Sequence, residues 1–305
     1  MIGEIAALTA ALLWALSSVV YSFLGQKIPP LQLNLLKGII AVFLIGLTLF
    51  IQQTSITLIA PIPLFLLACS GLIGIGLGDT AYFLALNSLG ARKTLVLETL
   101  SPPMGALLAF IVIGETIAPL AWCGILLTLC GVIWVISEQK DEGTKDKAFQ
   151  KSNIKRKQGI IWAILAAIAQ AVGAVLSRIA LIESTINPLE SSLIRLVAGS
   201  AIAFILIKIP GFTTTQTLKK TVTGFSIKTI GIIILAATGS TYLGIWLQQI
   251  SLKYAPTGIA QTLLATSPLF VIPISLIMGE KLSLRSFVGV SIAIIGVGLL
   301  FIYRS

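Results

Sequence analysis

The sequence repeats itself at a spacing of about half its length, and the matched residues are mostly the prolines and glycines that bend or end helices. A shift of 165 positions aligns Pro103 with Pro268, Gly114-Glu115 with Gly279-Glu280, Gly124 with Gly289, and Gly131-Val132 with Gly296-Val297. At the start of each half a shift of 156 to 158 aligns Gly3 with Gly159 and Lys37 with Arg195. Each copy holds five membrane-length apolar stretches. Because five is odd, the second copy enters the membrane from the opposite face, which predicts an inverted repeat.

The composition assigns the class of protein. The 305 residues are 56% hydrophobic and 10% charged, with a mean hydropathy of +1.02, whereas soluble domains are about a quarter charged. The expected spans are 4–25, 31–51, 64–86, 94–113, 117–137, 159–180, 189–209, 227–250, 257–278 and 283–303, each near the ~20 residues that cross a bilayer. We predict an all-α membrane protein with ten transmembrane helices in two inverted five-helix repeats, 1–137 and 159–305, joined by a polar linker loop, 138–158.

The first apolar stretch is interpreted as a transmembrane helix. It starts with Glu4, contains no Lys or Arg, and continues past Tyr21, unlike a cleaved signal. Three cysteines, Cys69, Cys123 and Cys130, lie within predicted spans, where a thiol behaves as a small apolar side chain. Their spacing matches no disulfide framework and no zinc motif. We therefore expect no cofactor and no metal site.

The net charge of +10 indicates membrane topology rather than nucleic-acid binding, because the basic residues gather in alternate loops. Sixteen Lys and Arg residues lie on the side reached after the first helix, three lie on the side of both termini, and Lys37 and Arg195 lie inside spans. By the positive-inside rule the sixteen-charge side is cytoplasmic. This predicts a multi-pass protein of the cell (inner) membrane with both termini outside the cytoplasm.

These features together resemble the drug/metabolite transporter superfamily, EamA-like branch, over essentially the whole chain. The resemblance rests on the five-helix repeats, a proline in each fourth helix (Pro103, Pro268), a Gly-Glu pair where that helix ends, and a basic residue in each second helix. It implies a carrier of small organic solutes, an amino-acid or drug-like solute exporter among them, with a central cavity between the repeats. Ten-helix relatives usually keep both termini in the cytoplasm, which is the reverse of the charge-based prediction.

Ionisable residues inside spans are candidates for function, because each costs on the order of 3 kcal/mol at the bilayer centre. Lys37 lies ~9 Å deep from the basic side, Asp79 at a similar depth, and Glu98 nearer that face. We predict a pair of Lys37 with Asp79 or Glu98; the alternative is that Lys37 snorkels and Asp79 caps a helix. Gly239 stands where a second Asp79 would be, so Arg195 lacks an acidic counterpart and is a candidate for meeting an anionic group or gating the opposite mouth.

Polar and aromatic residues at helical spacing form a second set of candidates for lining a cavity, with packing as the competing interpretation. The set comprises Trp14, Ser17 and Tyr21, their repeat partners Gln170, Gly173 and Ser177, the matched Tyr82 and Tyr242, Trp246, and Gln261. Gln261 must find a hydrogen-bond partner or face water. Pro103 and Pro268 are expected to kink their helices, and small residues to allow close helix approach.

Two features bear on alternatives to transport. Gly76-Leu77-Gly78-Asp79 matches the GxGD string of intramembrane aspartyl proteases, but the other aspartates, Asp141 and Asp146, lie in the polar loop, and the chain has no histidine. We therefore expect no enzyme; a non-transporting membrane scaffold is the other alternative. No Walker string is present, so ATP is not the direct driver. We predict a secondary transporter that works by alternating access, with a small-molecule substrate, the lipid bilayer and, through Asp79 or Glu98, protons as partners.

Overall fold

The computed structural model describes residues 1–24, 28–53, 59–89, 94, 97–138, 151–182, 184–209, 227–270 and 284–303, and their regular structure is entirely helical. The first repeat contains α1 (Ile2–Leu24), α2 (Pro30–Ile51), α3 (Pro61–Ser70), η1 (Gly71–Gly78), α4 (Asp79–Leu89), α6 (Ser101–Ile113) and α7 (Pro119–Glu138). The second contains α8 (Lys151–Ile182), α9 (Pro188–Lys208), α11 (Ile227–Ala237), η2 (Thr238–Leu243), α12 (Gly244–Tyr254), α13 (Thr257–Leu264) and α15 (Leu284–Ile302).

The helices have the length and composition of a multi-pass membrane protein. Five are long and apolar enough to cross a bilayer: 31–51, 61–86, 157–182, 188–208 and 227–254. Four shorter apolar helices, 2–17, 101–113, 119–134 and 287–302, occupy other predicted spans. Of the predicted ninth span, residues 257–264 and 267–270 are helical, and residues 271–278 lie outside the described residues together with Gly279-Glu280. Helix α8 starts at Lys151, ahead of the predicted start at residue 159 and inside the predicted linker.

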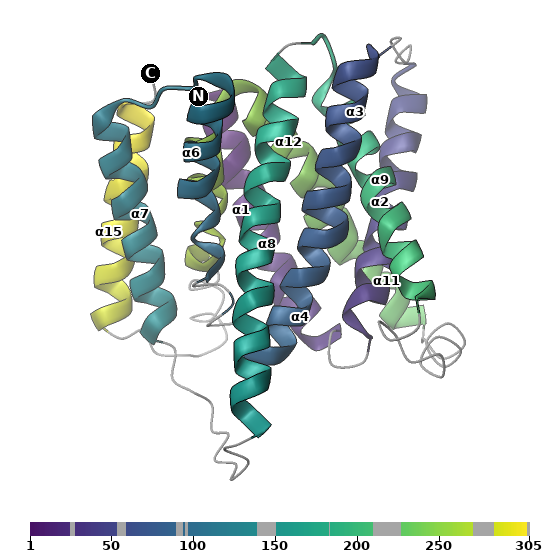
Figure 1. Cartoon of the computed structure of the whole chain (residues 1–305), viewed down its shortest axis with the longest axis horizontal. Helices are drawn as coiled ribbons and strands as arrows, with labels where there is room; N and C mark the ends of the chain where they lie inside the picture. The colour runs from purple at the N-terminus through teal and green to yellow at the C-terminus, as the bar shows by residue number, and fades with distance from the viewer. Residues whose placement is uncertain are drawn as a thin grey trace.

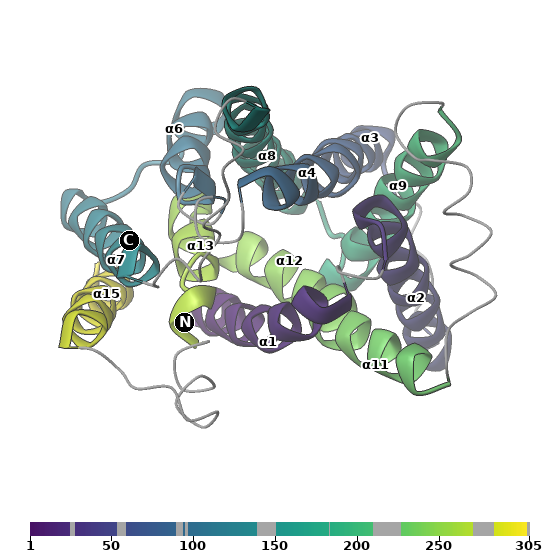
Figure 2. The same ribbon diagram turned by 90° about the horizontal axis from the view of Figure 1, so that it is seen from below.

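The two repeats interlock rather than stand side by side (Figures 1 and 2). Helix α1 packs on α12 of the second repeat, and α8, its counterpart, packs on α4 and η1 of the first. The remaining counterparts meet directly as α2 with α9, α6 with α13, and α7 with α15. This exchange of partners is the pattern that a pseudo-twofold axis between inverted repeats produces. Both ends of the chain lie on the same side of the bundle (Figure 1).

Helices approach most closely where glycines remove side chains. In the α7–α15 pair, which lies at one edge of the bundle (Figure 2), a Cβ added to Gly131 would lie 2.5 Å from the backbone nitrogen of Ala293. In η1, a Cβ added to Gly71 would overlap the backbone of Arg195 on α9. Without a hydrophobic driving force in lipid, such backbone-to-backbone contact holds helices together.

The third helix of each repeat contains a π-helical segment, η1 and η2, where a continuous α-helix over 64–86 or 227–250 was expected. A π-helical turn is wider than an α-helical one and is found most often at functional sites. Each segment faces the first helix of the other repeat, since α8 packs on η1 and α1 packs on η2. The widened turns therefore lie at the interface between the repeats.

The fourth helix of the first repeat is interrupted, and the interruption differs from the predicted proline kink. Thr99 and Leu100 form a turn, and α6 starts at Ser101, so Pro103 lies in its first turn. A proline there removes no helical hydrogen bond, because first-turn N–H groups have no intrahelical acceptor. In the second repeat, residues 265–266 form the corresponding turn and Pro268 lies in the helical residues that follow. Both prolines thus accompany a break rather than bend a continuous helix.

Candidate functional site

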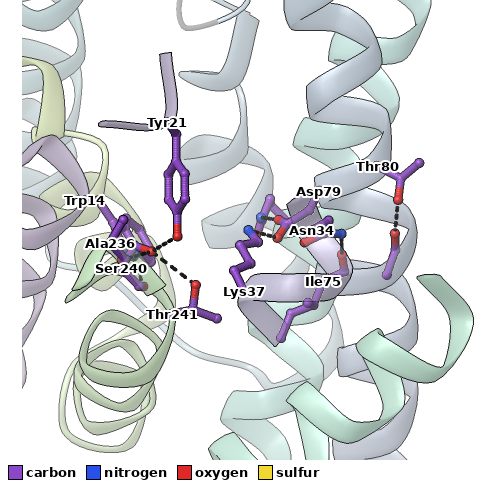
Figure 3. Close-up of polar contacts among 12 residues, drawn as sticks. Trp14, Tyr21, Asn34, Lys37, Ile75, Asp79, Thr80, Ala236, Ser240 and Thr241 are labelled. Atoms are coloured by element: carbon purple, nitrogen blue, oxygen red, sulfur yellow. Dashed lines mark hydrogen bonds and ion pairs between the residues drawn. The ribbon is translucent and has the colours of Figure 1, made fainter. Parts of the chain in front are cut away.

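Lys37 and Asp79 form an ion pair between α2 and α4. The Nζ atom of Lys37 lies 2.8 Å from Oδ2 of Asp79, the first residue after η1 (Figure 3). The side chains are 13% and 19% exposed, so the pair is largely enclosed without being sealed. Lys37 Nζ also lies 5.3 Å from the ring centroid of Phe83, at a distance suited to a cation–π contact. Of the two predicted partners, the structure brings Asp79 to Lys37.

A residue of the second repeat also hydrogen-bonds to this ion pair. Gln170 on α8 donates a hydrogen bond from Nε2 to Oδ1 of Asp79 at 3.3 Å. The backbone oxygen of Gln170 accepts one from Nε2 of Gln261 at 3.3 Å, and Oε1 of Gln261 lies 3.5 Å from Oγ of Ser101, the first residue of α6. Gln261 therefore finds the protein partners it requires. A connected set of polar contacts runs from Lys37 to Ser101, beside the interruption of the fourth helix, and crosses the interface between repeats.

The predicted stripe on the first helix packs against the third helix of the other repeat. Trp14 Nε1 donates to the backbone oxygen of Ser240 at 2.8 Å, and the hydroxyls of Tyr21 and Ser240 lie 2.8 Å apart (Figure 3). Ser17 Oγ lies 3.4 Å from the backbone oxygen of Ala236. These side chains bind η2 and the end of α11, so the packing interpretation describes their contacts in this structure.

The matched face of α8 repeats this arrangement in the first repeat. Ser177 Oγ lies 2.8 Å from Oγ of Ser70, and Ser70 also donates to the backbone oxygen of Gly173 at 2.6 Å. A Cβ added to Gly173 would lie 3.1 Å from Cα of Gly74 in η1. Counterpart faces thus dock on counterpart helices, which shows how the sequence repeat becomes a structural repeat.

Arg195 on α9 is enclosed, with 1% of its surface exposed. Its NH1 group donates to Oε1 of Gln248 on α12 at 3.2 Å. Its Nε is buried and has no acceptor among the described residues. The outer nitrogen NH2 faces η1, because a Cβ added to Gly74 would lie 3.4 Å from it. Arg195 therefore lies inside the bundle between the two third-helix elements and not at an open mouth.

The remaining candidates occupy separate places. Tyr242 in η2 lies 2.9 Å from Oγ1 of Thr48 through its hydroxyl, and its ring lies 6.3 Å from that of Trp246. The ring of Tyr82 meets its neighbour Phe83 edge to face at 5.7 Å. Glu98 lies close enough to Asp79 for their charges to interact, and its buried Oε1 accepts no hydrogen bond within the described chain.

Sequence reasoning missed a set of contacts on the side of the termini, although it placed the Gly-Glu pair at a helix end. Gly114 has φ +65°, and its N–H donates to the backbone oxygen of Phe110 at 3.1 Å, which ends α6 in the αL motif. The Glu115 carboxylate then accepts from Nε of Arg178 at 3.0 Å and from the backbone N–H of Thr257 at 2.8 Å.

Arg178 extends this set of contacts to the end of α12. Its NH1 group donates to the backbone oxygens of Leu252 and Lys253 at 2.8 and 2.7 Å. We call Glu115, Arg178, Thr257 and these two carbonyls the Glu115 clamp; it joins a turn of the first repeat to α8, α12 and α13 of the second. The sequence signal was Arg178 itself, one of three basic residues on the terminus side.

The interlocked inverted repeats, the intramembrane ion pair beside their interface and the interrupted helices define the class of protein: a polytopic membrane protein built like a secondary transporter. The family model described as "EamA-like transporter family" matches residues 1–137 and 157–302. The chain belongs to this family, within the drug/metabolite transporter superfamily. One solved crystal structure of a protein shares the fold with a TM-score of 0.74 and 16% sequence identity, covering 99% of this chain and 98% of that one. A search of curated proteins finds no match.

Proposed function

We propose that this protein is a secondary transporter that moves a small organic metabolite, such as an amino acid or a drug-like solute, by alternating access. Membership of a transporter family supports solute transport. The observation that carries the proposal is the Lys37–Asp79 ion pair, which is partly exposed inside the bundle and hydrogen-bonded by Gln170 of the opposite repeat. An intramembrane charge pair at a repeat interface is the expected position of a substrate or coupling site.

The geometry suggests how solute and protein exchange contacts. Lys37 offers three donors and Asp79 four acceptor positions, so a polar solute that enters between them replaces a protein contact with a contact of its own. Because Gln170 belongs to the other repeat, displacement of its bond to Asp79 loosens the interface along which the repeats move. Asp79 and the nearby Glu98 are also the carboxyls through which protons would couple to this movement; exchange or facilitated flux requires neither.

Flux through reconstituted protein tests the function. Purified protein in liposomes is given a panel of labelled amino acids and small metabolites, and uptake is compared with that of empty liposomes. Lys37→Met and Asp79→Asn should reduce the flux of the transported solute at least tenfold at equal protein content. Lys208→Gln, at the exposed end of α9 near the ring of Phe204, is the matched control and should leave flux unchanged. A protein that carries no solute in any condition would support the scaffold alternative.

We also propose that the protein lies in the cell (inner) membrane with both termini outside the cytoplasm. The support is the distribution of Lys and Arg, sixteen on one side against three on the other. A reporter fused after Ser305 should be active as an extracytoplasmic domain, and one inserted near Lys147 as a cytoplasmic domain. The reverse pattern would show that the orientation usual for ten-helix relatives overrides the charge distribution.

A further inference from the structure

The guanidinium of Arg195 has many more hydrogen-bond donors than its surroundings satisfy. An arginine carries five N–H donors, and within the described chain this one makes a single hydrogen bond, the 3.2 Å contact with Oε1 of Gln248. The side chain is 1% exposed, so bulk water does not supply the missing acceptors. A buried charge is normally paired, and this one has a neutral amide instead.

No carboxylate of the described residues compensates this charge at ion-pair distance. Gly239, which the sequence repeat aligns with Asp79, lies elsewhere, because a Cβ added there would meet only Oγ of Ser17. Asp79 itself is near enough to interact with Arg195 electrostatically. Its carboxylate oxygens, however, are bound to Lys37 and Gln170. The guanidinium therefore has no ion-pair partner among the described residues.

A second buried donor without an acceptor lies one helical turn away. Oγ of Ser191, four residues before Arg195 on the same face of α9, donates to Oε1 of Gln249 at 2.8 Å. Nε2 of Gln249 is buried and has no hydrogen-bond partner among the described residues. Two orphaned donors, Arg195 Nε and Gln249 Nε2, thus occur at the same interface between α9 and α12, and both require an acceptor.

We propose that Arg195, with Gln248 beside it, is an anion-binding site that receives the carboxylate group of the transported solute. A carboxylate has two acceptor oxygens in the geometry that matches a guanidinium fork. It would also neutralise the positive charge of the Arg195 guanidinium. The glycine-rich wall of η1 at Gly74 brings backbone rather than a side chain against NH2. This inference rests on the proposed transport function and specifies one chemical group of its substrate.

Binding is tested without transport, on the full-length protein in lipid nanodiscs. Sodium acetate and sodium chloride are titrated separately, with HEPES as the balancing anion at constant ionic strength, and the thermal unfolding midpoint is measured. Acetate should raise the midpoint of the wild-type protein by about 3 °C with saturation, because a ligand that binds only the folded state stabilises it. Arg195→Gln should abolish this rise, Arg195→Lys should keep part of it, and Lys208→Gln should keep all of it.

Three results would overturn the site: no saturable effect of acetate on the wild type, the same effect in Arg195→Gln, or saturation by chloride alone, which would assign the site to an inorganic ion. If Arg195→Gln does not fold, Gln248→Leu replaces it and should weaken acetate binding at least threefold. An unchanged acetate affinity in Gln248→Leu would equally refute the site.

Flux measurements separate this inference from the proposed function. In liposomes, each amino acid of the panel is compared with its carboxamide, which lacks the anionic group. The acid should be carried at least tenfold faster than the amide, and Arg195→Gln should bring this ratio close to one. Flux with no preference for the acid would refute the carboxylate site and leave the transporter intact. Saturable acetate binding without flux of any solute would support the anion site and refute transport.

Discussion

The second helices of the two repeats carry a basic residue at the same place, and the two residues have different surroundings. Lys37 has a carboxylate 2.8 Å away and is 13% exposed. Arg195 has an amide oxygen at 3.2 Å and is 1% exposed. The third helices supply different partners: α4 presents the carboxylate of Asp79 to Lys37, and α12 presents the amide of Gln248 to Arg195. The repeat therefore sets the position of the basic residue in the second helix, and the third helix of the same repeat decides whether its partner is a carboxylate or a neutral amide.

The largest effect on stability is expected at the Lys37–Asp79 ion pair. Lys37→Met or Asp79→Asn alone leaves the other group without its partner, at a cost of about 3 kcal/mol for a largely buried pair. The double variant should recover most of this loss. Chemical unfolding of all four proteins gives the coupling energy. A coupling energy indistinguishable from zero would mean that the contact contributes nothing to stability and that Lys37 is held by solvent.

A carboxylate placed next to Arg195 should give this residue an ion-pair partner like that of Lys37. Gln248→Glu is nearly isosteric and puts a charge where Oε1 now accepts from Arg195. Replacing the neutral amide acceptor with a carboxylate turns this hydrogen bond into an ion pair and should raise the unfolding free energy by about 2 kcal/mol. Acetate binding should weaken in the same variant, because the internal carboxylate occupies the guanidinium. Lower stability with unchanged acetate affinity would show that Arg195 does not bind an anion.

Removing the positive charge should affect the unfolding free energy differently at Arg195 and at Lys37. Arg195→Met orphans no carboxylate, so it should change the unfolding free energy by less than about 1 kcal/mol or stabilise the protein, as apolar replacements of buried charges often do. Lys37→Met should destabilise it. Thermal unfolding of the two variants side by side measures this contrast. Equal destabilisation would indicate that Arg195 is a structural residue.

The smallest effects are expected at two tyrosine hydroxyl contacts that join the two repeats. Tyr21→Phe removes the contact with Ser240, and Tyr242→Phe removes the contact with Thr48. Both hydroxyl partners keep a second hydrogen bond to a backbone carbonyl, so neither is orphaned. Each substitution should therefore cost only about 0.5–1 kcal/mol in unfolding free energy. A large loss of flux in only one of the two variants would reveal a functional asymmetry that the hydrogen bonds do not show.

Features of the sequence that repeat were predictable, and features that depend on contacts between distant residues were not. The apolar composition and the matched prolines and glycines predicted an all-α membrane protein with two five-helix repeats. The similar depths of Lys37 and Asp79 in neighbouring helices allowed the contact between them. Depth alone did not choose between Asp79 and Glu98, because depth says nothing about rotation around a helix axis. The ten-span count and the orientation of the termini stay predictions.

Three features had no readable signal or a misleading one. The π-helical segments lie where the third helices pack against α8 and α1, and these contacts between distant residues have no signal in the local sequence. Pro103 lies in an apolar run that conceals the turn at Thr99 and Leu100, so it suggested a kink instead of a break. Glu115 was assigned to a helix end, but its partner Arg178 lies 63 positions away in the other repeat.

The Glu115 clamp bears on how a carrier built this way would behave from its two faces. A carboxylate that holds Arg178 and the start of α13 must release both before the terminus-side helix ends can part, and charge-assisted hydrogen bonds are worth about 1.5–3 kcal/mol each. The conformation open to that face is then the less populated one. Because only this conformation binds solute from that face, its low population raises the half-saturation concentration measured there. Microscopic reversibility requires the maximal rate from that face to rise in proportion when nothing else drives the cycle. The clamp therefore does not make the carrier a one-way valve; it gives the two faces unequal half-saturation concentrations with the same ratio of maximal rate to half-saturation.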